Sequence, residues 1–161
     1  MCRFSPVLLI VATALAPGLA AAQAAGGSYV SSLSSVYAAT QFIHARKDGC
    51  DSAEPDTRKA NDAAYNAWRK KHQLLLDELE RRFLAMVHNS SLDQNDYSKN
   101  VGKYAGEVLQ NLEEMKKQFL SQPPQEVSRQ CREFPDYLRG KDADLARRYA
   151  AELKVIRKRK L

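Results

Sequence analysis

The 161-residue sequence predicts an all-α protein, an antiparallel bundle of four to five helices with one long central helix, stapled by one disulfide. Three observations predict this fold. No proline occurs between Pro55 and Pro123, apolar residues recur at steps of three and four, and the alternation typical of strands is absent. Because each expected helix has a single apolar stripe, each must bury that stripe against another helix.

The first residues have the composition of a secretory signal peptide. A basic residue, Arg3, precedes an apolar run that Pro17 interrupts, and small residues follow. The run is shorter than the roughly 20 residues that a membrane span needs, so cleavage is expected rather than anchoring. We expect a signal peptide over residues 1–22, with cleavage there or after residue 24. Residues 25–161 would then form a single helical domain, periplasmic or secreted, with no transmembrane segment.

The cysteines fit an exported protein. Cys2 would leave with the signal peptide, so that Cys50 and Cys131 remain in a compartment where disulfides persist. We expect these two residues to form a disulfide, with two free buried thiols as the alternative. In the chain-entropy model, a bridge between residues so far apart stabilises the fold by roughly 4 to 5 kcal/mol.

Two helices are expected before the long polar link near residue 90. The first covers residues 28–46, and Asp48-Gly49 should end it, since glycine readily adopts the left-handed conformation that closes a helix. The second covers residues 55–87, and Pro55 suits its first turn, because the missing N–H would be unpaired there anyway. At about 50 Å, this second helix would be the spine of the fold.

A third helix is expected from Asp96 to the S-Q-P-P-Q stretch, and it has the most regular heptad pattern in the sequence. Gly102 and Gly106 weaken this helix but also permit the close approach of a neighbour. We expect it to flank the second helix along most of its length. Its apolar stripe consists of Tyr97, Val101, Tyr104, Val108, Leu112, Met115 and Phe119.

Two shorter helical pieces should follow, stacked end to end beside the second helix. In the first of them, Pro135 interrupts the apolar stripe and should kink the helix or begin a new turn. Asp142 or Asp144 can cap the last helix, which ends in R-K-R-K-L. Positive charge at the C-terminal end of a helix interacts favourably with the negative end of the helix dipole.

Composition and motifs argue against catalysis and nucleic-acid binding. The chain has a net charge of +6, or +5 once Arg3 is removed, and basic and acidic residues alternate as on solvated helix faces. The sequence holds no G-x-S-x-G elbow, glycine-rich phosphate loop, C-x-x-C pair or paired-carboxylate motif. We therefore expect no enzymatic activity and no cofactor. An exported chain is also a poor candidate for binding nucleic acid.

His72 is the one histidine that shares the expected buried stripe of the long helix, together with Trp68, Leu75 and Leu79. A bundle interior can hold haem or a metal, and Met86 or Met115 could supply a second ligand there. We favour the plainer interpretation, a boundary histidine bonded to a nearby polar group, because lone helical histidines and methionines are common.

The C-terminal run of Arg157, Lys158, Arg159 and Lys160 could contact an anionic surface such as phospholipid or lipopolysaccharide headgroups. Each charge near such a surface contributes roughly 1 kcal/mol. The alternative is a solvated, frayed chain end.

Four segments, D-G-C, Y-N-A-W-R-K-K, Q-C-R-E-F-P-D-Y-L and D-L-A-R-R-Y-A-A-E-L, follow a signal peptide in this order. In this arrangement the chain resembles small exported helical proteins of Gram-negative bacteria to which no activity is attached. The resemblance implies location and architecture only. We expect an exported, non-enzymatic helical protein that binds an envelope component or a protein partner. The alternative is a small-ligand, haem or metal carrier centred near His72, and the oligomeric state stays open.

Overall fold

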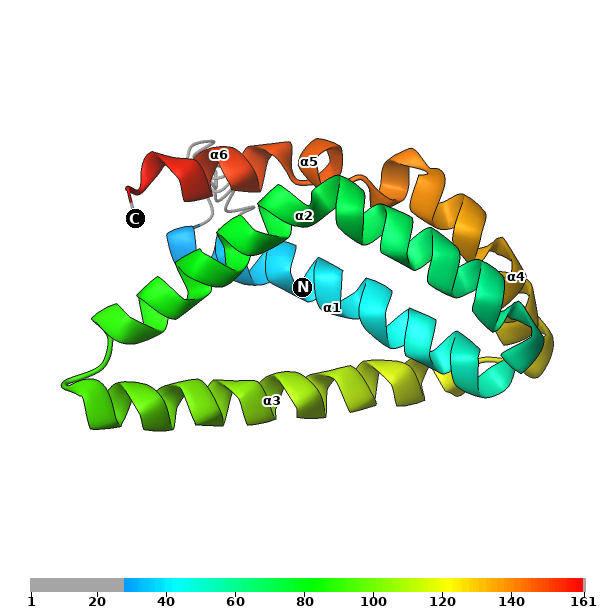
Figure 1. The fold of residues 1–161 in the computed structure, drawn as a ribbon, viewed down its shortest axis with the longest axis horizontal. Helices are drawn as coiled ribbons and strands as arrows, with labels where there is room; N and C mark the ends of the chain where they lie inside the picture. Colours follow the sequence, from blue (N-terminus) through cyan, green and yellow to red (C-terminus); the bar gives the residue numbers. More distant parts are fainter. Residues whose placement is uncertain (1–27, 161) are drawn as a thin grey trace, which may run out of the picture.

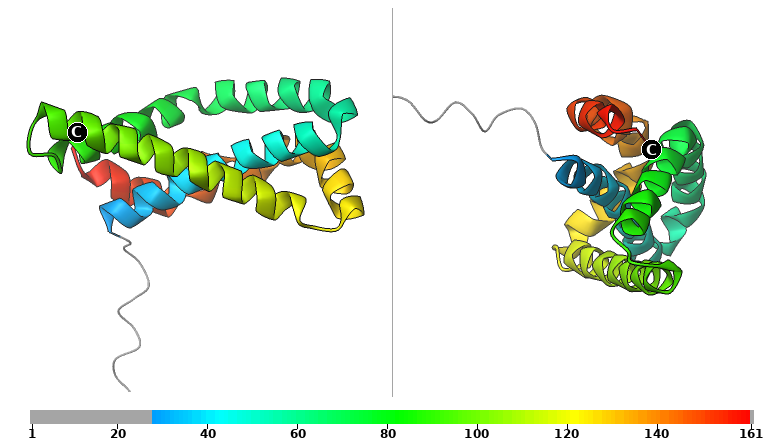
Figure 2. Two further views of the ribbon diagram at one scale, coloured as in Figure 1. Left: turned by 90° about the horizontal axis from the view of Figure 1, so that it is seen from below. Right: turned by 90° about the vertical axis from the view of Figure 1, so that its left-hand side faces the viewer.

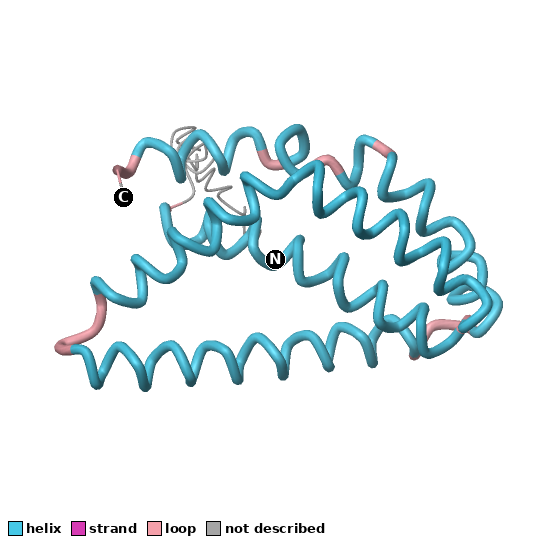
Figure 3. The backbone as a smooth tube through the Cα atoms, viewed as in Figure 1, coloured by secondary structure: helices cyan, strands magenta, loops and turns pink. Residues whose placement is uncertain are grey.

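The computed structural model describes residues 28–160, and every regular element among them is helical (Figures 1 and 3). This confirms the all-α prediction. The signal peptide expected over residues 1–22 lies outside the described residues. No described helix is both long enough and apolar enough to cross a membrane. In chain order the elements are α1 (Tyr29–Ala53), η1 (Pro55–Thr57), α2 (Arg58–Asn89), α3 (Gln94–Leu120), α4 (Pro124–Arg139), η2 (Lys141–Ala143), α5 (Leu145–Arg148) and α6 (Ala150–Lys158).

The chain runs back and forth along the long axis of the molecule. α1 and α2 are antiparallel, α3 returns in the direction of α1, and α4, α5 and α6 follow one another back along α2 (Figure 1). This brings α6 beside the beginning of α1. Short pieces therefore follow one another end to end as expected, but only α4 packs closely along α2, whereas α6 packs mainly against α1.

The main core is formed by α1, α2 and the segment from α4 to α6, without α3. Large apolar side chains from these elements interdigitate around Trp68, whose indole N–H donates a buried 2.7 Å hydrogen bond to the carbonyl of Ala143. That bond fixes η2 against the middle of α2. The buried members of the cluster are Leu33, Val36, Ile43, Trp68, Leu75, Leu79, Phe134, Leu138, Ala143, Leu145, Leu153 and Ile156.

α3 does not flank α2 along most of its length, contrary to the expectation from the sequence. It leaves α2 after the turn that joins them and crosses α1, against which it packs (Figure 2). Phe119 is the only residue of α3 that is buried, and the rest of its apolar stripe is half-buried. The most regular heptad of the sequence thus belongs to the least covered helix.

Gly49 does not end α1, which continues to Ala53. The expected stop was wrong because Gly49 has a packing role instead. A Cβ atom at this position would lie 2.5 Å from Cδ1 of Phe119, so the absence of a side chain lets the Phe119 ring rest on the α1 backbone. This contact anchors the C-terminal end of α3.

Gly102 and Gly106, in contrast, receive no neighbour. A Cβ atom at either position would have no atom of a neighbouring helix or side chain within 4 Å. The close approach that these glycines permit does not occur, because the side of α3 that carries them faces away from the other described helices.

The Cys50–Cys131 disulfide is present and joins the end of α1 to α4. The two Cα atoms are 5.2 Å apart, which is within the usual range for a disulfide, and 81 residues separate the cysteines. Both cysteines are fully buried and form a second small cluster with Phe119 and Val127. The bridge therefore sits where α1, α3 and α4 meet.

The C-terminal quarter follows the expected signals with two differences. α4 continues through Pro135 as one helix, and the expected last helix is divided into α5 and α6 at Tyr149. Of the two expected caps, Asp144 is the one used: its side chain accepts a 3.2 Å hydrogen bond from the backbone N–H of Arg147.

Candidate functional site

His72 lies where the sequence places it, on the buried side of α2. It is 5% exposed, its ring is 5.2 Å from that of Trp68, and its Nε2 atom has no hydrogen-bond partner among the described residues. Burial lowers the pKa of His72, the nearby Asp144 carboxylate opposes this, and Lys71 adds to it. Burial therefore favours the neutral form of the imidazole over the charged form.

The structure does not bring a methionine to His72. Met86 is fourteen residues further along the same helix, which corresponds to about 21 Å, and it lines a different cavity together with Met115. Within residues 28–160 no group of three or more His, Cys, Asp or Glu side chains is arranged to hold a metal ion. Neither of the two methionines expected as a second ligand therefore lies beside His72.

The positive charge of the chain is concentrated in one segment, residues 139–160, which we call the C-terminal basic segment. It holds nine Lys and Arg against three Asp and Glu, whereas residues 28–138 hold 15 against 16. All nine basic side chains of the segment are exposed. The excess charge of the described chain therefore lies on the last residue of α4 and on η2, α5, α6 and the turns beside them, along one edge of the fold.

Two arginines of the expected R-K-R-K contact surface are engaged within the fold. Arg157 makes a two-pronged ion pair with Glu78 of α2, in which Nη2 lies 2.7 Å from Oε2. The hydrogen bond from Arg157 lowers the pKa of Glu78; burial opposes this, and Arg82 lowers it further. The guanidinium of Arg159 stacks over the ring of Tyr29, 4.8 Å from its centroid.

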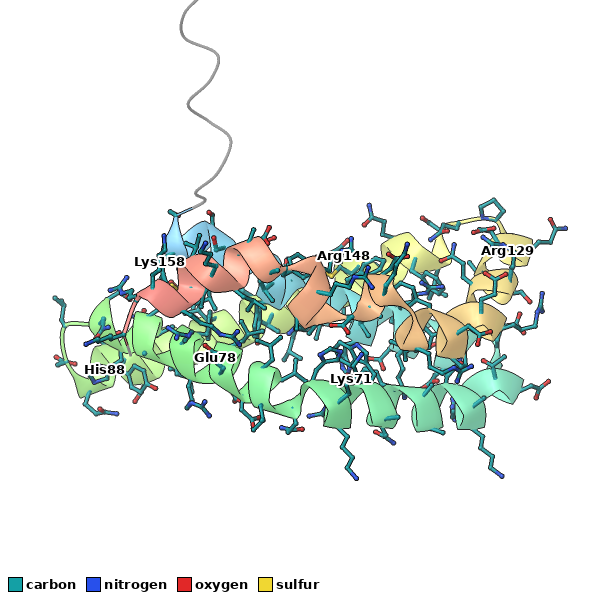
Figure 4. All side chains as sticks on the ribbon, turned by 90° about the horizontal axis from the view of Figure 1, so that it is seen from above. Lys71, Glu78, His88, Arg129, Arg148 and Lys158 are labelled. Carbon is teal, nitrogen blue, oxygen red and sulfur yellow. A yellow bond between two sulfur atoms is a disulfide. The ribbon has the colours of Figure 1, made fainter. Side chains whose placement is uncertain are left out.

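These contacts dock α6 onto α1 and α2 and leave its other side free. In Figure 4, Glu78 and Lys71 lie between α2 and the α5–α6 segment, whereas Lys158 and Arg148 lie on the side of that segment away from α2. Lys71 pairs with Asp144 at 2.9 Å and so ties α5 to α2 in the same way. The basic segment is thus held in a defined position by its inner side.

Five cations of the segment have side chains without an ion pair, hydrogen bond or ring contact to any other described residue. They are Lys141, Arg147, Lys154, Lys158 and Lys160. An open hollow of about 590 Å³ is lined by Lys141 and Arg147 together with Asp142 and Arg148. Free cations that project from a docked segment can attract an anionic partner over a distance of about 10 Å at ordinary ionic strength.

The sequence prediction therefore found part of this surface. It identified Lys158 and Lys160, but it missed Lys141, Arg147 and Lys154 because they do not form a continuous run. The signal that could have found them is the net charge of each segment, since residues 139–160 alone account for the basic character of the chain.

No protein-family model, curated protein or solved structure matches this chain.

Proposed function

We propose that this protein is an exported, non-enzymatic helical protein that binds an anionic envelope surface, such as phospholipid or lipopolysaccharide headgroups, through the C-terminal basic segment. The observation that supports this proposal is the concentration of the excess positive charge in residues 139–160, with every basic side chain exposed. A signal peptide over residues 1–22 would deliver the protein to that surface.

The spacing of the free cations fits contact with a plane of negative charge. On α6 the exposed Lys154 and Lys158 are four residues apart and lie on one face, opposite the buried Leu153 and Ile156. Each lysine near an anionic membrane contributes roughly 1 kcal/mol. The buried disulfide also agrees with a protein that works in an oxidising compartment.

The test is binding to vesicles that contain phosphatidylglycerol, measured by co-sedimentation at low salt. We expect the wild type to bind these vesicles and not vesicles of phosphatidylcholine alone, and we expect added salt to weaken binding. The triple variant Lys154→Gln, Lys158→Gln, Lys160→Gln should bind about 100-fold more weakly, since three contributions of about 1 kcal/mol are removed.

A matched control removes the same charge from elsewhere. Lys59, Lys70 and Lys99 are exposed and form no ion pair with another described residue, so the triple Lys→Gln variant at these positions has the same net charge. This control variant should keep most of the wild-type affinity for the vesicles. Equal loss in both variants would mean that net charge alone drives binding, and no binding by the wild type would leave a protein partner as the better interpretation.

A further inference from the structure

A cavity of about 230 Å³ lies where α1, α2 and α3 come together, on the side of α1 away from α6. Its walls include the aromatic rings of Tyr37 and Phe83 and the thioethers of Met86 and Met115. The cavity is separate from the C-terminal basic segment and from His72, because none of their residues lines it.

The packing of α3 explains why this space exists. At one end α3 is held by the contact of Phe119 with Gly49. Nearer its other end the rings of Tyr104 and Phe83 form a T-shaped pair, with centroids 5.6 Å apart. Phe83 in turn stacks on Tyr37 at 5.5 Å. Between these two anchors α3 contributes no fully buried side chain, so the three helices leave a partly open cavity, with Ser34, Ala38 and Asn111 exposed at its rim, rather than a filled core.

The lining indicates the chemistry of the ligand. About a quarter of the residues in the chain are charged, but no residue that lines the cavity is charged. This lining disfavours a charged ligand. Ser34, Gln41 and Asn111 supply neutral polar groups, and none of the three makes a side-chain hydrogen bond to another described residue. An apolar site with a few polar groups that fix orientation is the usual form of a small-molecule site.

The volume limits the size of that ligand. An apolar cavity of about 150 Å³ can hold benzene, and a water-sized group occupies roughly 30 Å³ of liquid, so this cavity accommodates about seven or eight such groups. We propose that the cavity binds a small neutral amphiphile, with an apolar body of about that size and one uncharged hydrogen-bonding head group. This binding site is independent of the anionic surface proposed above.

The experiment uses the two methionines as reporters. Of the three methionines in the sequence, Met86 and Met115 both line the cavity, so ¹³C-methyl labelling of methionine places two NMR probes in its wall. Titration with a series of 1-alkanols should shift both resonances. Affinity should rise about fourfold with each added methylene and level off once the chain fills the cavity, near 1-octanol. Octanoate should bind more weakly at neutral pH, because its carboxylate would lose part of its hydration without gaining a charged partner among the lining residues.

A matched pair of variants locates the site. Ala38 lines the cavity, and Ala105 lies exposed on α3 and is not one of the lining residues. Ala38→Phe should abolish the 1-octanol shifts, whereas Ala105→Phe should leave them unchanged, and far-UV circular dichroism confirms that both variants are folded. Binding that persists in Ala38→Phe, equal binding of octanoate and 1-octanol, or unmoved methionine resonances in the wild type would each overturn the proposal.

Discussion

Replacing Gly49 by alanine tests how α3 is attached to the bundle. In an ordinary helix interior this change stabilises by about 1 kcal/mol, because alanine loses less backbone entropy than glycine. At Gly49, however, the new methyl group would lie 2.5 Å from Cδ1 and 3.0 Å from Cε1 of Phe119, whose ring is 4% exposed and packed against the disulfide. Overpacking of this kind costs about 1–3 kcal/mol. We therefore expect Gly49→Ala to destabilise by about 1 kcal/mol.

The assay is urea unfolding, compared with Gly102→Ala in the same buffer. Gly102 also lies in a helix, but a Cβ there meets nothing within 4 Å, so alanine should stabilise by about 1 kcal/mol. The two variants should differ by about 2 kcal/mol. In a Phe119→Leu background the penalty at Gly49 should largely disappear, since the smaller side chain relieves the overlap. If Gly49→Ala stabilises as much as Gly102→Ala, then Phe119 does not pack on the α1 backbone as described.

Two further predictions concern the disulfide and the buried histidine. Replacing both Cys50 and Cys131 by serine should lower the free energy of unfolding by about 4.5 kcal/mol, since 81 residues separate them, and urea unfolding measures this; an unchanged midpoint would contradict it. Burial lowers the pKa of His72, so the unfolded chain takes up a proton more readily than the folded one. Stability is then fully present above about pH 6.5 and falls as the pH drops below it, by at most about 1.4 kcal/mol per pH unit. His72→Gln should lose this part of the pH dependence, and an identical pH profile in both proteins would refute the assignment.

The course of the helices could be predicted from local signals, but the packing of α3 could not. Pro55, the proline-free stretch after it and the S-Q-P-P-Q break each act on the backbone within a few residues, so α2 and α3 begin and end within a few residues of the expected positions. Gly49 shows the limit of such reasoning. A glycine that ends a helix cannot be distinguished in sequence from a glycine against which an aromatic ring packs. At Gly49 the ring belongs to Phe119, which is 70 residues further along the chain.

The candidate sites also divide into features that the sequence predicts and features that depend on the tertiary structure. The disulfide followed from the expected compartment and the number of cysteines, and two of the five free C-terminal cations, Lys158 and Lys160, followed from a contiguous run of charges. The roles of Arg157 and Arg159 inside the fold depend on Glu78 and Tyr29, which only the tertiary structure brings to them. The neutral cavity draws its walls from three helices, so no local pattern in the sequence indicates it.

The most direct test of the proposed function is lysine footprinting of the intact protein on vesicles that contain phosphatidylglycerol. Each exposed lysine is acetylated with and without vesicles, and the change in rate is read by mass spectrometry. The proposal predicts that Lys154 and Lys158 become protected, whereas Lys59, Lys70 and Lys99 react at unchanged rates. Protection spread evenly over all five lysines, or confined to the last three, would contradict the assignment of the C-terminal basic segment as the contact surface.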